Sequence, residues 1–493
     1  MDKVEEKQGD VSNKVETQHI NSEPKTSKLA ILSLVIGTSS LFFFVFTGIP
    51  AIIIGIISHI RIRNSNGLLK GKYIAIAGMN VPILLMLIFL LFWSIDAPPI
   101  PNDYTIDDLR SAPAEYIESF DLLKNLAGLE GDVEKQFPIT DSPAIKISEK
   151  DKNISYEIRE ILQKGQALEI ALIFISHAKN IEQMWTKNEK AREIISRLYE
   201  YPEIADLTEP TSDIKHLSYF RLIELAYFYE IYAHTRKEEN KIRNFTIELI
   251  KLNSIFRKLC LNARSLIGIT ACMACMSINI NSANTIANNP STSTESLELL
   301  AEHFKQPTNQ QLSMRNTLLF DYLYFQYFII EDISKIRMGN SPLIKNNSTL
   351  RLYRNYIDSW INDLDNIEDT TNTDFSVWPN FYTFGKSVSI QNDEQLPFLY
   401  KFYNPIGSKL IYISEFSKYS GKRTASIIKH DLLQTVLNKR LGKEVNLQAR
   451  AYSDEYIIDL EKKIILSPGP DSELETEDDI KLPINPEVLC FTK

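Results

Sequence analysis

The sequence predicts a mainly α-helical protein with N-terminal transmembrane helices, a large soluble all-helical domain and a small antiparallel β tail at the C-terminus. Two apolar blocks without charge lie between residues 29 and 94, and about 20 apolar residues are enough for a helix to cross a bilayer. Apolar side chains then recur at helical spacing through much of residues 105–445. After residue 446 the pattern changes to short apolar runs around turns, which indicates strands.

Length and composition divide the chain and limit its class. The 493 residues are too many for one small domain. We expect, in order, a disordered cytoplasmic tail at 1–27, a transmembrane module at 28–95, a linker at 96–104, a helical soluble domain at 105–445 and a small β tail with an acidic loop at 446–493. A composition of 44% hydrophobic and 24% charged residues is globular. The formal net charge of −9 argues against a nucleic-acid partner.

The first apolar block, Leu29–Ile60, has 32 residues, which is too long for one comfortable crossing of a bilayer. It is interrupted at Gly37–Ser40 and again at Thr47–Pro50, and proline removes a backbone donor from a helix. The block predicts a helical hairpin, or a helix followed by a re-entrant piece, with a break near Gly48. The second block, Tyr73–Ser94, has 22 residues without charge and predicts one full span.

Charged residues around the two blocks predict the orientation of the chain. Basic residues flank the first block on both sides: Lys25 and Lys28 before it, and Arg61, Arg63, Lys70 and Lys72 after it. Acidic residues follow the second block: Asp96, Asp103, Asp107 and Asp108. Basic flanks remain in the cytoplasm. If the first block is a hairpin, both basic flanks are cytoplasmic and the third span exports everything after Ile95. We therefore expect a protein of the cell (inner) membrane, with the lipid bilayer as a partner and the soluble domain extracytoplasmic.

The membrane segment also resembles a known module. The stretch KTSKLAILSLVIGTSSLFFFVFTGIPAIIIGIISHIRIRNSNGLLKGKYIAIAGM contains a Gly-Ile-Pro-Ala-Ile turn, an Ile-Gly-Ile helix and a basic Gly/Ser loop before the last helix. Over residues 26–94 this pattern closely resembles a small bacterial membrane module of unknown function. The resemblance implies a bacterial membrane protein, and it carries no activity with it.

Helical patterns follow one another in the soluble part. Pro98, Pro99 and Pro101 predict a stiff exit from the membrane, and Thr105 with Asp108 forms a helix-start pair. Five longer segments have helical periodicity: Ser155–Ala178, Ile181–Tyr199, Asp213–Lys237, Asn240–Leu261 and Leu312–Arg337. The soluble domain is therefore expected to be a packed set of helices.

The apolar run Leu266–Ile280 has 15 residues, which is short for a membrane span, so it predicts a central core helix. It contains Cys272 and Cys275. Because no second cysteine pair completes a zinc site, we interpret them as small buried side chains. Loops are predicted at Asn281–Thr294 and at Thr370–Gln395, and the second loop carries an aromatic cluster. Such a cluster either forms a surface that binds a ligand or packs on the core. Packing on the core, which holds the loop in place, is the more common role.

The last helix and the β tail are marked by glycine and by turns. Gly421–Arg440 predicts a helix that Gly442 ends. Tyr452–Leu466 predicts two short strands around a turn near Glu461–Lys463. The acidic loop, residues 467–479, and one more short strand follow.

The order of elements at the C-terminal end carries a second resemblance. Asn404–Gly407, the helix up to Arg440, the strand pair and then SPGPDSELETEDDIKLPI resemble uncharacterised helical envelope proteins of planctomycete-type bacteria. Their tails in turn resemble the C-terminal sheet of type II secretion pseudopilins, in which a loop binds calcium. Six residues fit that loop without a gap: Gly469, Asp471, Thr476, Asp478, Asp479 and Ile480. Ser472 and Glu475 replace two of its glycines, and because the prepilin start is missing we do not expect a pilus subunit.

The acidic loop is the best chemical site in the sequence. Calcium takes about six to eight oxygen ligands. This loop contains six carboxylates in a stretch of nine residues. The resemblance implies a metal site at Asp471, Asp478 and Asp479, with calcium as the cofactor. A solvated acidic turn without an ion remains the alternative, because runs of charge are usually just solvated.

No familiar catalytic motif is present in the sequence, which lacks His-Glu-x-x-His, Gly-x-Ser-x-Gly and a phosphate-binding loop. We therefore predict a membrane-anchored extracytoplasmic helical protein with a structural or partner-binding role in the bacterial envelope, and no catalytic residue. Two alternatives stay open. One is an envelope hydrolase with a site assembled from distant residues, for instance around His216 or Trp378. The other is a secretion-system accessory protein, which depends on the resemblance of the tail alone.

Overall fold

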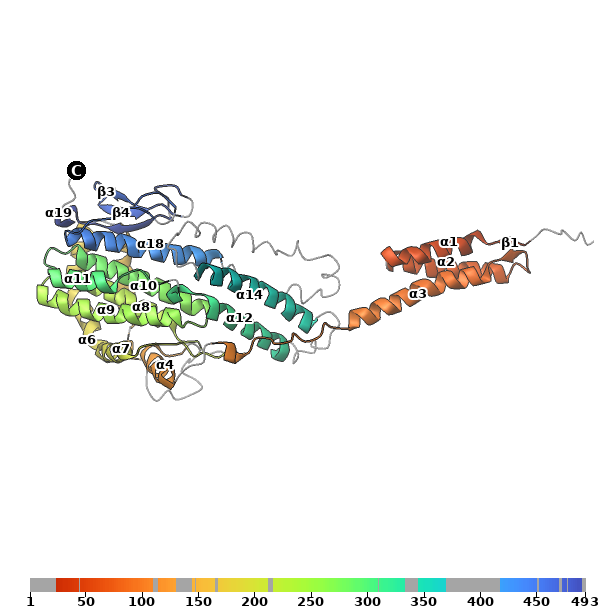
Figure 1. The fold of residues 1–493 in the computed structure, drawn as a ribbon, viewed down its shortest axis with the longest axis horizontal. Helices are drawn as coiled ribbons and strands as arrows, with labels where there is room; N and C mark the ends of the chain where they lie inside the picture. The colour runs from red at the N-terminus through yellow and green to blue at the C-terminus, as the bar shows by residue number, and fades with distance from the viewer. Residues whose placement is uncertain are drawn as a thin grey trace, which may run out of the picture. The chain divides into compact units, whose positions relative to one another are not determined.

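The computed structural model is mainly helical, with apolar helices near the N-terminus and a small antiparallel sheet of three strands near the C-terminus (Figure 1). It confirms the predicted mainly α fold class. The structure describes residues 24–43, 45–109, 114–129, 144–146, 148–164, 167–211, 216–308, 310–332, 345–368, 417–449, 452–469, 472–476 and 478–489. The chain divides into two compact units, Met1–Asp96 and Ala97–Lys493.

The N-terminal unit is a bundle of three helices, α1 (Lys28–Phe43), α2 (Val45–Arg63) and α3 (Lys72–Ser94). The predicted break near Gly48 is wrong in position, because α1 ends at Phe43 and α2 already begins at Val45. Gly48 and Pro50 lie within the first two turns of α2. The missing proline N–H there removes one helical hydrogen bond, which does not end the helix.

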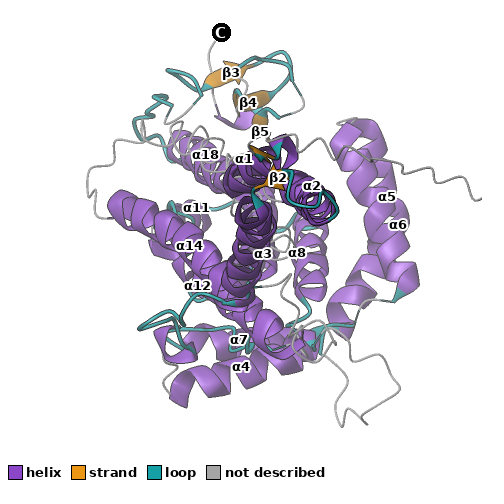
Figure 2. Cartoon of the chain, turned by 90° about the vertical axis from the view of Figure 1, so that its right-hand side faces the viewer, coloured by secondary structure: helices purple, strands orange, loops and turns teal. Residues whose placement is uncertain are grey.

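A short strand pair lies at one end of this bundle (Figure 2). β1 (Lys25–Thr26) pairs in parallel with β2 (Leu69–Lys70), and the backbone N–H of Ser27 donates to the carbonyl of Lys70 at 2.9 Å. The pairing brings the basic residues before α1 next to the basic linker between α2 and α3. Both basic flanks of the first apolar block therefore lie at the same end of the unit.

The second unit is built mainly of helices. Its longer helices are α4 (Ala114–Ala127), α5 (Glu149–Lys164), α6 (Ala167–Lys187), α7 (Glu189–Glu200), α8 (Tyr219–His234), α9 (Glu239–Leu261), α10 (Leu266–Ala287), α11 (Thr294–His303), α12 (Arg315–Tyr327), α14 (Asn346–Glu368) and α18 (Ser417–Arg440). Short helical turns are η1 (Ile106–Asp108), η2 (Gln310–Leu312), η3 (Phe328–Asp332) and α19 (Pro486–Leu489). In Figure 1, α10 lies among α8, α9 and α18, and it packs against all three.

The apolar sequence of α10 places it in the core of the second unit, as predicted. Most of its side chains are buried, including those of Cys272 and Cys275. Both cysteines are free thiols, and burial raises the pKa of each thiol well above its usual range. These cysteines are therefore inert core side chains, as the sequence indicates.

Several predicted helices are divided or shortened in the structure. The segment Ile181–Tyr199 is divided at Asn188, whose side-chain amide donates to the Met184 carbonyl at 2.8 Å. Its Oδ1 accepts from the backbone N–H of Lys146 at 2.8 Å. Because asparagine competes in this way for backbone groups, α6 ends and α7 begins here. The predicted helix Ser155–Ala178 covers parts of α5 and α6, and α8 begins only at Tyr219. The predicted helix Leu312–Arg337 is present as α12, which continues after Tyr327 as the π-helical turn η3.

The loop predicted at Asn281–Thr294 is wrong at its start, because α10 continues to Ala287. The side chain of Asn281 donates to Glu230 Oε1 at 2.8 Å, and that of Asn284 donates to the Pro483 carbonyl at 2.8 Å. In the local sequence these polar side chains favour a loop. In the folded chain they form hydrogen bonds with residues far away in the sequence, and the helix continues.

The C-terminal sheet contains β3 (Ile457–Asp459), β4 (Ile464–Ser467) and β5 (Ile480–Pro483) in the order β3–β4–β5, antiparallel throughout. The predicted strand pair and the final strand are therefore present. The turn between β3 and β4 holds Lys463 at φ 55°. The last long helix ends before Gly442, which adopts φ 67°, as expected for a glycine after a helix.

Residues 97–104 are held against α12 and α14 rather than extending freely. Asp103 accepts hydrogen bonds from the Tyr322 hydroxyl at 2.7 Å, from Gln326 Nε2 at 3.0 Å and from Arg354 Nη1 at 2.8 Å. The Arg354 guanidinium carbon also lies 3.4 Å from the ring centre of Tyr104. This cluster fixes the entry of the chain into the second unit.

We expect Asp103→Ala to lower the free energy of unfolding of the second unit by about 2 kcal/mol. The reason is that three donors lose their acceptor at a carboxylate that is only 18% exposed. Urea unfolding of the full chain in detergent measures the change. The matched control is Asp107→Ala, which removes an exposed carboxylate four residues further on. Equal stability of the two variants would contradict this role for Asp103.

Candidate functional site

The N-terminal unit has large apolar side chains outside and small ones inside. The exposed set includes Ile31, Leu32, Val35, Phe46, Ile49, Ile53, Ile56, Ile57, Ile60, Leu84, Leu87, Ile88 and Leu91. The described buried residues of the unit are serines, alanines, glycines and one proline: Ser27, Ala30, Ser33, Gly37, Ser40, Gly48, Ala51, Gly55, Ser58, Ala75, Gly78 and Pro82. Among the described residues, two helical stretches are long and apolar enough to cross a bilayer, Phe46–Arg63 in this unit and the mostly buried Leu266–Ala287 of α10. Small side chains at helix contacts are typical of helices that pack within lipid.

Glycine and serine bring the backbones of this bundle close together. A Cβ added at Gly78 of α3 would meet the Ser33 hydroxyl and would lie 2.8 Å from the Leu34 nitrogen. A Cβ added at Gly37 of α1 would lie 2.8 Å from the Gly78 carbonyl oxygen. The Ser33 hydroxyl itself donates to the Ala51 carbonyl of α2 at 2.9 Å. Ser33 and Gly78 therefore mark the point at which all three helices meet.

The acidic loop connects β4 to β5. Of its residues, Pro470, Asp471 and Glu477 lie outside the described part of the chain. Ser472 has φ 60° and Glu475 has φ 66°, which are left-handed values that glycine adopts most easily. Both residues carry a side chain, so this turn holds some backbone strain.

Asp478 and Asp479, two of the three predicted metal ligands, are held by contacts within the loop. Asp478 Oδ1 accepts from the Thr476 hydroxyl at 2.7 Å, and Asp479 Oδ2 accepts from the Glu475 N–H at 3.0 Å. Asp479 Oδ1 is buried without a hydrogen-bond partner among the described residues. The Glu475 carboxylate forms an ion pair with Lys462. Within the described part of the chain, no group of three or more ligating side chains is placed to hold a metal ion.

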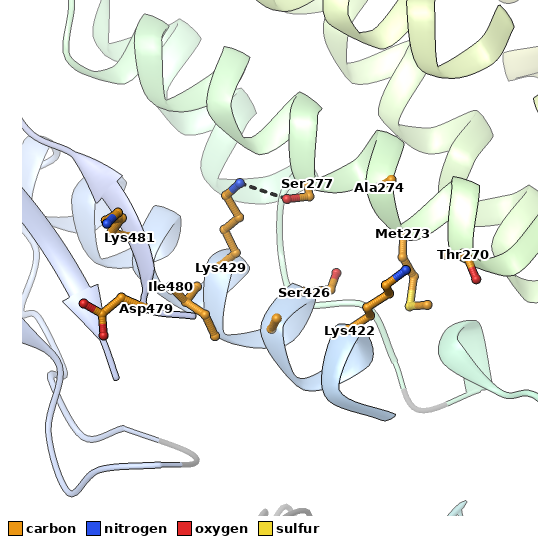
Figure 3. A pocket seen from close by; sticks show the side chains of 11 residues that line it. Thr270, Met273, Ala274, Ser277, Lys422, Ser426, Lys429, Asp479, Ile480 and Lys481 are labelled. Carbon is orange, nitrogen blue, oxygen red and sulfur yellow. Dashed lines mark hydrogen bonds between the residues drawn. The ribbon is translucent and has the colours of Figure 1, made fainter. Parts of the chain in front are cut away.

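A cavity of about 410 Å³ lies beside this loop, between α10, α18 and the start of β5 (Figure 3). Positions 270, 273, 274 and 277 of α10 line it, and positions 422, 425, 426 and 429 of α18 line it with the same spacing. Residues at this spacing share one face of a helix. Because Ala274, Ala425 and Ser426 are small, the facing surfaces of the two helices leave space between them.

Lys429 and two serines form the polar part of the cavity. Lys429 Nζ donates to Ser277 Oγ at 2.8 Å (Figure 3). Burial lowers the pKa of Lys429 to about 8, and the charge of Glu230 acts in the opposite direction. Ser426 is only 4% exposed, and its hydroxyl has no hydrogen-bond partner among the residues that the structure describes. The cavity therefore places a hydroxyl without a partner in the described part of the chain one turn from a lysine.

The cavity is not predicted from the sequence, although Asp479 at its rim is a predicted site residue. Figure 3 shows the carboxylate of Asp479 directed away from Lys429 and Ser277, which separates the loop from the polar part of the cavity. The spacing of Lys422 and Lys429 is visible in the sequence. Their partner helix, however, lies 152 residues earlier, and no local pattern reveals that pairing.

The two positions named for a hydrolytic site gain no support from this geometry. His216 precedes α8 and does not line the cavity, and its Nδ1 is buried without a partner within the described residues. Trp378 and the rest of the predicted loop Thr370–Gln395 lie outside the described residues.

Comparisons with known proteins identify only the N-terminal unit. Residues 29–92 match a family described as Domain of unknown function (DUF4190). No curated protein and no solved structure matches the chain. The match confirms that a domain of unknown function occupies the segment predicted to be such a module, while nothing names the rest of the chain. The protein therefore carries a DUF4190 domain at residues 29–92, followed by a helical unit with a small β tail.

Proposed function

We propose that residues 28–95 anchor the protein in the inner membrane of a bacterial cell and that the helical unit is extracytoplasmic, with a structural or partner-binding role in the envelope. One observation carries this proposal: the N-terminal unit exposes large apolar side chains over a small-residue interior. A large exposed apolar surface is typical of contact with a membrane or a partner. The helices have 16, 19 and 23 residues. At about 1.5 Å per residue the longer two extend over roughly 28 and 34 Å, and a bilayer core is about 30 Å thick.

The orientation follows from the two basic flanks. They lie at the same end of the unit because β1 pairs with β2. A hairpin of α1 and α2 with both flanks in the cytoplasm obeys the preference of lysine and arginine for that side. The third helix then leads the chain out of the cytoplasm.

Thiol labelling in intact spheroplasts tests the orientation. Cys260, Cys272 and Cys275 are buried and do not compete for a membrane-impermeant maleimide. We expect Cys490 to react in intact spheroplasts, and Asn64→Cys, in the exposed turn after α2, to react only after permeabilisation. The opposite pattern would reverse the orientation, and release of the chain by alkaline carbonate would contradict anchoring.

We further propose that the acidic loop binds calcium through Asp471, Asp478 and Asp479, as its resemblance to the pseudopilin loop implies. Two observations support this. The backbone at Ser472 and Glu475 is left-handed, and Asp479 has a buried oxygen without a partner in the described residues. A divalent cation would compensate this carboxylate and stabilise the strained turn.

Calcium is expected to bind weakly, with a Kd of about 10⁻⁴–10⁻³ M, as in extracellular modules. At ten times the Kd it should stabilise the full chain by about 1.4 kcal/mol, which a thermal shift and a calorimetric titration both detect. Asp479→Asn should abolish the effect, whereas the control Glu461→Gln, an exposed carboxylate in the β3–β4 turn, should keep it. If calcium produces no heat in the titration and no thermal shift, the proposal is wrong and the loop is a solvated acidic turn without an ion.

An envelope hydrolase is the second candidate function, and one contact favours it. Ser277 Oγ accepts a hydrogen bond from Lys429, whose pKa is lowered to about 8. A lysine that loses its proton near this pH can activate a serine hydroxyl as a nucleophile. Hydrolysis of p-nitrophenyl acetate by the full chain, lost in Ser277→Ala, would support an enzyme. Equal rates of hydrolysis by the natural chain and by Ser277→Ala would contradict a hydrolase at this site.

A further inference from the structure

We infer that the cavity between α10 and α18 binds a small ligand that carries a carboxylate or phosphate group, with Lys429, Ser277 and Ser426 as the recognising side chains. None of these residues belongs to the N-terminal unit or to the acidic loop, so the inference does not depend on membrane anchoring or on calcium. A volume of about 410 Å³ lies within the range of small-molecule sites, which is roughly 300–1,000 Å³.

The polar part of the cavity offers more hydrogen-bond donors than it has acceptors among the described residues. A lysine ammonium has three N–H groups, and among the described residues Ser277 is the hydrogen-bond partner of Lys429. Ser426 lies one turn earlier on the same face of α18, with a buried hydroxyl that has no partner there. Buried polar groups are nearly always paired in folded proteins. An anionic oxygen placed between Lys429 and Ser426 would satisfy both.

The charge of the lining favours an anion over a cation. Lys422 and Lys429 of α18 contribute two positive charges to the lining, and the carboxylate of Asp479 is directed away from Lys429 (Figure 3). The remaining surface includes the side chains of Met273, Ala274, Ala425 and Ile480. The site therefore suits an anionic group attached to a compact apolar body.

Matched aromatic probes test this inference on the full chain in lipid nanodiscs. Benzoate, phenyl phosphate and benzamide have the same ring, and only the first two are anions. Ligand-observed NMR titrations should show benzoate or phenyl phosphate binding about tenfold or more tightly than benzamide. The anion that binds more tightly shows whether the site prefers a carboxylate or a phosphate group. Equal binding of all three probes, or no saturable binding of any, would overturn the inference.

Substitutions localise the binding. Lys429→Met keeps an unbranched side chain without charge, and it should weaken binding of the preferred anion about tenfold while leaving benzamide unchanged. The control is Lys481→Met, because this lysine lies on β5, apart from Ser277 and Ser426 in Figure 3. Ser426→Ala removes a hydroxyl that has no partner within the described residues, so it should fold normally and still weaken the anion severalfold. Full binding by both Lys429→Met and Ser426→Ala would refute the assignment.

The pH dependence provides a separate readout. Lys429 loses its charge as the pH rises through about 8, so benzoate should bind less tightly at pH 9 than at pH 7 while benzamide does not change. The other charged residues that line the cavity or act on Lys429 are Glu230, Lys422, Asp479 and Lys481. Because the dependence is assigned to Lys429, it should disappear in Lys429→Met, and its persistence there would contradict this role.

Discussion

Gly78→Ala is expected to separate α3 from α1 and to unfold the N-terminal unit. The added methyl group would meet the Ser33 hydroxyl and lie 2.8 Å from both the Leu34 nitrogen and the Ser33 carbonyl carbon. Two of these three atoms are backbone atoms and cannot move aside as the end of a side chain can. Overpacking a well-packed core typically costs about 1–3 kcal/mol, and a backbone clash belongs at or above the top of that range. Heat-induced aggregation of the detergent-solubilised chain, followed by size exclusion, measures the loss.

The matched control is Gly48→Ala in α2 of the same bundle. A Cβ at Gly48 would lie 3.5 Å from Pro82 Cβ, which is an ordinary van der Waals contact. Alanine is also the better helix former, so this variant should be as stable as the natural chain or slightly more stable. If the two alanine variants aggregate at the same temperature, close packing of α1 on α3 does not hold the unit together.

The contrast between these glycines explains why the sequence predicts the apolar blocks but misplaces the break between α1 and α2. Near Gly48 a glycine and a proline lie close together, and locally that pair predicts a helix end. In the bundle, Gly48 instead faces Pro82 of α3 and Pro50 lies early in α2. Which glycine ends a helix and which one allows a close contact is decided by the partner helix.

The second unit shows the same limit. The run of apolar residues is enough to place α10 in the core, because such a helix must be covered on all sides. The polar end of α10 is not predictable, because its asparagines are satisfied by Glu230 and Pro483, 51 and 199 residues away. The cavity is hidden for the same reason, since small residues on two helices form a site only when those helices face one another.

His430 is expected to make the protein lose stability in mild acid. Its ring is fully buried in α18, with Nδ1 2.8 Å from the Ser426 carbonyl and Nε2 without a partner among the described residues. Burial lowers the pKa of His430 to about 4 in the folded chain, against about 6.5 when the chain is unfolded. Between these values the unfolded state binds the additional proton. The free energy of unfolding therefore falls as the pH drops from 6.5 towards 4, by up to about 3 kcal/mol for this side chain.

Urea unfolding of the full chain at pH 7.0, 5.5 and 4.5 measures this dependence, and His430→Gln should reduce its slope by about one proton. The reference variant is His234→Gln, because burial also lowers the pKa of His234 to about 4, beside Phe174. Each variant should flatten the pH profile partly and the double variant should flatten it further, since the two histidines lie on different helices. Comparing slopes removes any constant loss caused by the glutamine itself. A slope that His430→Gln leaves unchanged would show that other groups cause the acid sensitivity of this fold.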